Sequence, residues 1–93
     1  MKKSEIANQL KREQLSLDIQ ALEYDLKYLQ YEDVFYKEQV KTYNDMALAL
    51  YRTINKMFGD VYALNFKFDE QTLRLLAKWA DLRNKVNDNK KAA

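Results

Sequence analysis

A single apolar stripe constrains the fold of this chain more than any other feature of its sequence. Between residues 15 and 57, side chains on one helical face recur at alternating steps of four and three residues without interruption. This is the heptad pattern of helices that pack along a seam. Only Asp33 in the stripe is polar. The positions are Leu15, Ile19, Leu22, Leu26, Leu29, Asp33, Tyr36, Val40, Tyr43, Ala47, Leu50, Ile54 and Met57.

The unbroken phase of the stripe predicts one long, coiled-coil-like helix from about residue 5 to residue 58. A loop inside this range would remove any reason for the phase to persist, and neither glycine nor proline occurs before Gly59. The alternative is a compact three-helix bundle with a break near residue 33 or 44, where Asp33 or Asp45 would cap a new helix.

The remainder of the chain completes a single all-α domain over residues 1–93. Gly59 suits the left-handed position that ends many helices. Apolar side chains then alternate up to residue 68, which predicts a short extended connector over 59–68. Asp69 is the expected N-cap of a C-terminal helix over about 69–87, and residues 88–93 read as a loose tail.

A second apolar face lies opposite the stripe in the first half of the long helix. It contains Leu17 and Ala21 and the candidate partner-binding residues Tyr24, Tyr28, Tyr31 and Phe35. A helix that is apolar on two faces must be covered on both. We expect either the C-terminal helix to cover this face, with Trp79 beside the tyrosines, or a protein partner to bind it.

Basic residues on the C-terminal helix form a weaker candidate surface for nucleic acid. Arg74, Lys78 and Lys85 share one helical face, as phosphate-binding residues would. Asp81 interrupts this face, however, and the formal net charge of the chain is only +2.

Several classes of chemistry find no support in the composition. The chain has no histidine or cysteine and only one glycine, so the usual general base, a thiol nucleophile and a glycine-rich phosphate loop are all missing. We therefore expect no enzymatic activity, no cofactor and no metal site. No apolar run approaches the roughly 20 residues of a membrane span, so we expect a cytoplasmic protein that does not bind membranes.

These observations predict a helical protein–protein interaction module, acting as an adaptor or as an inhibitor of a larger protein. We expect a homo-oligomer, with a dimer favoured, joined through the Leu15–Met57 stripe. The alternatives are a nucleic-acid-binding or nucleoprotein accessory role and a structural or scaffolding role. Richness in Lys, Asn and Tyr and small size suit a phage or mobile-element accessory protein.

Overall fold

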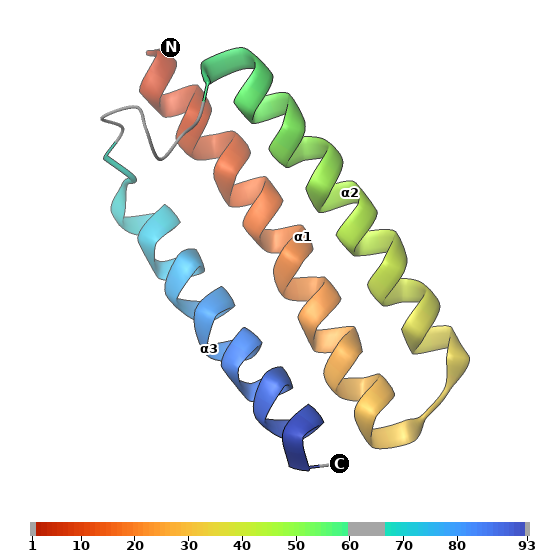
Figure 1. The fold of residues 1–93 in the computed structure, drawn as a ribbon. Helices are drawn as coiled ribbons and strands as arrows, with labels where there is room; N and C mark the ends of the chain where they lie inside the picture. Colours follow the sequence, from red (N-terminus) through yellow and green to blue (C-terminus); the bar gives the residue numbers. More distant parts are fainter. Residues whose placement is uncertain (1, 60–66, 93) are drawn as a thin grey trace.

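The fold is a bundle of three helices, which confirms the predicted all-α class. The computed structural model describes residues 2–59 and 67–92, and all regular secondary structure within these ranges is helical. Helix α1 spans Lys3–Tyr31, α2 spans Val34–Phe58 and α3 spans Glu70–Ala92 (Figure 1).

The chain reverses direction between α1 and α2, so the prediction of one continuous helix is wrong and the alternative break near residue 33 is correct. Glu32 takes the left-handed conformation with φ of 56°, and its N–H donates to the Tyr28 carbonyl over 2.8 Å. Asp33 then caps α2, since its carboxylate accepts the Phe35 N–H over 2.9 Å. Two residues therefore suffice to turn the chain.

Helix α1 lies in the middle of the bundle, with α2 on one side and α3 on the other (Figure 1). Helix α2 runs antiparallel to α1, whereas α3 runs in the same direction as α1. Among the described residues, α2 and α3 bring no pair of Cα atoms within 8 Å of each other. Each outer helix therefore packs mainly on α1.

The α1–α2 contact is aliphatic at one end and aromatic at the other. Ala7, Ile54 and Phe58 are buried together near the start of α1, and Leu10 and Leu50 pack against them. Towards the turn, Tyr24 of α1 stacks on Tyr43 of α2, with ring centroids 5.6 Å apart, and Tyr36 lies 6.2 Å from Tyr24. The second apolar face of α1 is thus covered by α2 around Tyr24.

Helix α3 docks on the other face of α1 through a polar network at its first turn. Asp69 caps α3 by accepting the N–H of Thr72 over 2.8 Å and its hydroxyl over 2.6 Å. Arg12 forms an ion pair with Asp69, and Asn8 accepts the Asp69 N–H over 2.9 Å. The start of α3 is therefore fixed beside the first turns of α1.

This docking corrects the predicted position of the last helix. Trp79 lines a cleft with Leu15 and Asp18, while the rings that contact Tyr24 belong to α2. The expectation that α3 covers the tyrosine-rich face is wrong because α3 starts beside Asn8 and does not return from the far end of the bundle.

The predicted signals at the helix ends are confirmed except at the C-terminus. Gly59 ends α2 with φ of 76°, and Asp69 is the N-cap of α3. Most of the predicted connector, residues 60–66, lies outside the described residues. Helix α3 continues to Ala92 instead of ending near residue 87, and Lys90 in its last turn pairs with Asp25 of α1 over 3.1 Å.

Candidate interaction surfaces

The predicted seam residues contribute to two different contacts within the chain. Leu15 and Ile19 are buried on α1, and Ala47 and Ile54 are buried on α2, where Ile54 is only 1% exposed. Burial of these side chains needs no second copy, so a dimer joined through this stripe stays a prediction. Two other residues of the stripe are exposed. Asp33 is the N-cap of α2, and Met57 is 55% exposed because Phe58 is the residue that is buried at the end of α2.

The four predicted partner-binding residues divide into two covered and two exposed side chains. Tyr24 is half-buried under the rings of α2, and Tyr28 is half-buried with the Lys37 ammonium 5.9 Å from its ring centroid. Tyr31 and Phe35, in contrast, are 60% and 53% exposed at the turn. The predicted aromatic face is therefore partly covered at Tyr24 and Tyr28 and exposed at Tyr31 and Phe35.

These exposed side chains form the tip cluster, which we define as Tyr31, Val34 and Phe35. Val34 is 62% exposed in the first turn of α2. The sequence did not predict it as a surface residue, because its exposure depends on the helix break at residue 33. The rings of Tyr31 and Phe35 both pack against Tyr36, at centroid distances of 6.0 and 5.6 Å. The cluster is thus held in place while most of its apolar surface faces water.

A polar chain on α1 lies in a cleft whose walls come from all three helices, with Tyr51 on the α2 side and Trp79 on the α3 side. The Lys11 ammonium donates to the Gln14 carbonyl oxygen over 3.0 Å, and the Gln14 amide donates to the Asp18 carboxylate over 3.1 Å. Lys11 and Gln14 are buried, and Lys11 also lies 5.6 Å from the ring centroid of Tyr51. Burial raises the pKa of Asp18, and the Gln14 hydrogen bond and the nearby Lys11 charge oppose that rise only in part.

This cleft has a volume of about 160 Å³, and its walls include Leu76 and Trp79 of α3. Its polar atoms largely satisfy one another, and the two nearest aromatic rings already face cations of the chain, Lys11 over Tyr51 and Arg83 over Trp79. The arrangement is more typical of a polar network that stabilises the fold than of a ligand-binding site.

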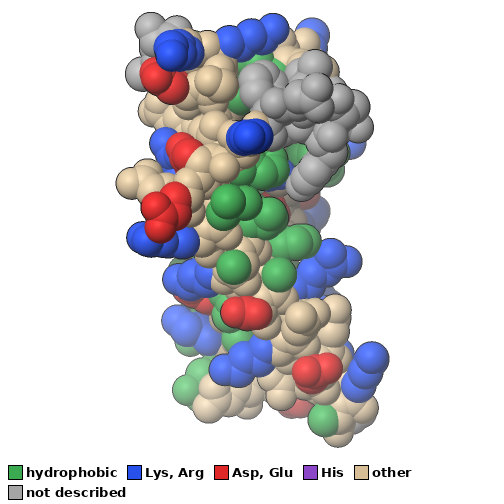
Figure 2. Space-filling view, turned by 90° about the vertical axis from the view of Figure 1, so that its left-hand side faces the viewer, with side chains coloured by type: hydrophobic (Ala, Val, Ile, Leu, Met, Phe, Trp, Pro, Cys, Tyr) green, Lys and Arg blue, Asp and Glu red, His purple; other side chains and the backbone are tan. Residues whose placement is uncertain are grey.

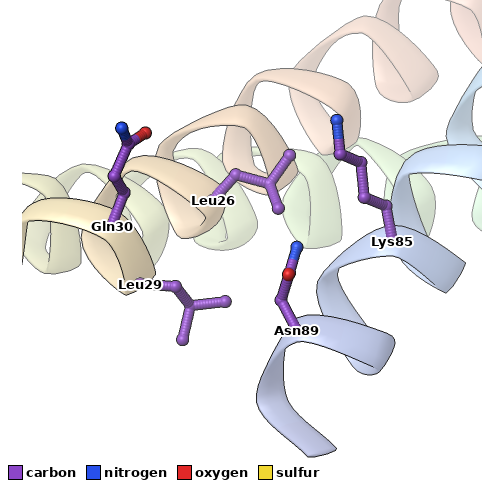
Figure 3. Close-up of a pocket in the computed structure, with 5 residues that line it drawn as sticks. All are labelled: Leu26, Leu29, Gln30, Lys85 and Asn89. Atoms are coloured by element: carbon purple, nitrogen blue, oxygen red, sulfur yellow. The ribbon is translucent and has the colours of Figure 1, made fainter. Parts of the chain in front are cut away.

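A larger hollow of about 440 Å³ lies between the later turns of α1 and α3. Leu26 and Leu29 extend from α1 towards α3, from which Lys85 and Asn89 rise beside them (Figure 3). The buried stripe of α3 ends at Val86, so polar side chains face the two leucines there. Among the described residues that line this hollow, none is an acid that could exchange a proton with Lys85.

The predicted nucleic-acid residues are partly engaged by acids. Arg74 pairs with Glu70 over 2.5 Å, and Lys78 lies 3.9 Å from Glu23 of α1, while Lys85 borders the hollow just described. On the α3 side of the molecule, basic side chains alternate with acidic and hydrophobic ones instead of forming one continuous basic surface (Figure 2). The geometry of α3 therefore gives less support to phosphate binding than the exposed apolar residues at the hairpin turn give to protein binding.

No protein-family model, curated protein or solved structure matches this chain. Among residues 2–59 and 67–92, no group of three or more acidic, histidine or cysteine side chains is placed to hold a metal ion. The helices in these ranges also include none that is long and apolar enough to cross a membrane. The surfaces of the bundle are therefore the basis for any functional proposal.

Proposed function

We propose that this chain is a non-enzymatic helical interaction module that binds a protein partner through the tip cluster. The observation that carries the proposal is the exposure of Tyr31, Val34 and Phe35, which are 60%, 62% and 53% exposed at one end of a rigid hairpin. Large apolar side chains gathered on a surface commonly mark a site of association.

The tip combines apolar area with a backbone that needs little further ordering. The Asp33 cap and the Glu32 hydrogen bond fix the turn, and contacts with Tyr36 restrain the two aromatic rings. Aromatic anchors that are already ordered lose less conformational entropy when they bind. A partner would therefore meet a preformed surface.

The charges around the tip indicate the chemistry of that partner. Glu32, Asp33 and Glu38 are exposed beside the cluster, with Lys37 as the neighbouring base. Such a surface complements an apolar pocket that is rimmed by Lys and Arg. We expect a single larger protein with a basic-rimmed apolar groove, which fits an adaptor or an inhibitor.

The test is affinity capture from the source cell with the immobilised full-length chain, followed by mass spectrometry. The double variant Tyr31→Ser/Val34→Ser should lose the captured protein while keeping its helical circular dichroism. Each removed anchor is expected to weaken binding at least tenfold, within the range of interface hot spots.

Leu48→Ser is the matched control, because Leu48 is a comparably exposed aliphatic side chain on α2, at 45%, far from the tip. Capture of one and the same protein by the wild type and by Leu48→Ser, and not by the tip variant, supports the proposal. Equal capture by all three chains contradicts it.

A further inference from the structure

Helix α2 carries a second stripe that neither α1 nor α3 covers within the described part of the chain. We define the α2 flank as residues 35, 39, 42, 46, 49, 53 and 57, which lie within an arc of about 80° on a helix that turns about 100° per residue. This arc lies roughly 90° from the side of α2 that faces α1. The flank consists of Phe35, Gln39, Thr42, Met46, Ala49, Thr53 and Met57.

No residue of the α2 flank is charged, although α2 carries six charged residues elsewhere, Lys37, Glu38, Lys41, Asp45, Arg52 and Lys56. Three of its side chains are large and exposed: Phe35, Met46 and Met57 are 53%, 48% and 55% exposed. A single exposed apolar residue is ordinary, but a continuous uncharged stripe along a whole helix is typical of a contact surface.

The two threonines of the flank turn their polar atoms inward. The Thr42 hydroxyl donates to the Glu38 carbonyl and the Thr53 hydroxyl to the Ala49 carbonyl, each over 3.0 Å. Because these hydroxyls are satisfied within the helix, covering them would leave no unpaired donor. The flank can therefore be buried without the penalty that threonines usually impose.

We infer that the α2 flank binds the same flank of a second copy of this chain, antiparallel, around a two-fold axis at Met46. Two pairs of flank residues are symmetric about this point, while Thr42 and Ala49 lie four residues before it and three after it. Phe35 and Met57 lie equally far from Met46 on either side, and so do Gln39 and Thr53. A two-fold contact places each residue opposite its counterpart, so Phe35 of one chain packs on Met57 of the other.

The charges that border the flank agree with this orientation. In the antiparallel pair, Glu38 of one chain lies between Arg52 and Lys56 of the other, since its two-fold counterpart is position 54. Asp45 is the charge that comes near its own copy, and it lies further from the centre of the stripe. The attraction of Glu38 for Arg52 and Lys56 thus outweighs the repulsion between the two copies of Asp45, and the bordering charges favour the antiparallel dimer.

The available area is also adequate. A helix of 25 residues is about 37 Å long, and α2 with its neighbour α1 presents a face about 20 Å wide. The projected area of roughly 700 Å² approaches the approximately 800 Å² that each partner contributes to a standard interface. Beside the flank, Leu17 of α1 and Leu50 of α2 line a hollow that also includes Gln9, Arg12, Glu13 and Ser16, so contact there would be apolar at the two leucines and polar at its rim.

Sedimentation equilibrium of the full chain tests the inference. We expect the wild type to reach twice the 11.1 kDa chain mass. Met46→Glu brings two like charges together at the axis and should raise the dimer dissociation constant at least tenfold. Leu48→Glu is the matched control, because Leu48 is equally exposed on the same helix but points away from the flank. It should leave the dimer unchanged.

The orientation has its own test, which the lack of cysteine makes simple. Under oxidation, a Met46→Cys chain should form a disulfide-linked dimer, and a Leu48→Cys chain should not. Glu38→Lys should weaken the dimer, and the added changes Arg52→Glu and Lys56→Glu should restore it.

A monomeric wild type, or equal effects of Met46→Glu and Leu48→Glu, would overturn the inference. These results can be separated from partner capture at the tip, because the capture test changes Tyr31 and Val34, which lie outside the α2 flank. Phe35 belongs to both surfaces and is changed in neither test. If the wild-type chain is monomeric and still captures its partner, the proposed function stands and the dimer inference is overturned.

Discussion

The two outer helices hold on to α1 by different means. Helix α2 follows a two-residue turn and packs through aliphatic and aromatic side chains along its length, from Phe58 to Tyr36. Helix α3 follows an eleven-residue connection from Gly59 to Asp69, is fixed by a polar network at its first turn, and borders a hollow of about 440 Å³ between its later turns and α1.

This difference teaches that the α1–α2 hairpin is the stable unit and that α3 is an added layer. Closing the longer connection costs roughly 1–2 kcal/mol more conformational entropy than closing the short turn. Apolar burial stabilises the hairpin contact, while the α3 contact depends more on hydrogen bonds, whose net contribution is small. Changes in the two contacts should therefore have different consequences.

The largest expected effect is the loss of the hairpin core. Ile54→Ala removes a side chain that is 1% exposed and packs in the cluster with Ala7 and Phe58. It should lower the free energy of unfolding by about 2–5 kcal/mol. Chemical denaturation followed by circular dichroism measures this loss. A change below about 1 kcal/mol would mean that the hairpin core is not the main source of stability.

A smaller and more local effect is expected at the start of α3. Thr72 is fully buried, and Thr72→Val keeps its shape while removing its hydroxyl donor to Asp69. The loss should be about 1–2 kcal/mol. Fluorescence of Trp79, the only tryptophan, should report it as earlier undocking of α3. Thr42→Val, at an exposed position, should change stability by no more than about 0.5 kcal/mol.

The cap at the hairpin turn should rank next. Asp33→Ala removes the acceptor of the Phe35 N–H and should cost about 1 kcal/mol. Asp33→Asn keeps an acceptor and should cost less. Thermal unfolding of both variants measures the difference, and equal losses would show that the cap does not stabilise the turn.

Acid should weaken the α3 contact through Asp69. The Thr72 hydroxyl and N–H, followed by Arg12, lower the pKa of Asp69 from an ordinary 3.8 to about 2. A carboxyl with a lowered folded pKa stabilises the fold above its unfolded pKa and loses that contribution as the pH falls from about 4 to 2. A pH titration of Trp79 fluorescence should follow this loss, and Asp69→Asn should abolish the dependence.

The smallest effect is expected at Asp18 and has the opposite sign. Burial raises the pKa of Asp18, so the free energy of unfolding falls as the pH rises from the unfolded pKa of 3.8 towards the folded pKa, and it stays lower at higher pH. Asp18→Asn should therefore increase stability at pH 7 and have no effect below pH 3.8, where both states are protonated. Urea unfolding at the two pH values measures this, and a loss at pH 7 would show that the Lys11 charge outweighs burial.

The sequence alone was sufficient for the class of the fold and for its capped ends. Asp33, Gly59 and Asp69 each carry a local signal, and each ends or begins a helix in the structure. Continuity could not be decided in this way, because the stripe keeps its phase across the turn. Glu32 takes a left-handed conformation, which costs a residue other than glycine roughly 1–2 kcal/mol of conformational energy. A glutamate at this position therefore does not predict a turn.

The choice of partner for each face of α1 was also beyond the sequence. Both faces repeat with the same period, so the pattern does not say that Tyr24 meets α2 and that Leu15 meets Trp79. Tyr31 and Phe35 could be named as surface candidates, but Val34 needed the break to be known. The α2 flank could not be recognised from the sequence, because charged residues such as Glu38 and Arg52 border it and only the structure shows which side of α2 faces α1.

Native-state hydrogen exchange tests the central claim, that a stable α1–α2 hairpin carries α3 as a separate layer. We predict that amides of α3 exchange through an opening of lower free energy than amides of α1 and α2, and that Thr72→Val accelerates exchange in α3 alone. If amides of all three helices share one free energy of opening, and Thr72→Val accelerates them equally, the bundle unfolds as a single unit and the claim is contradicted.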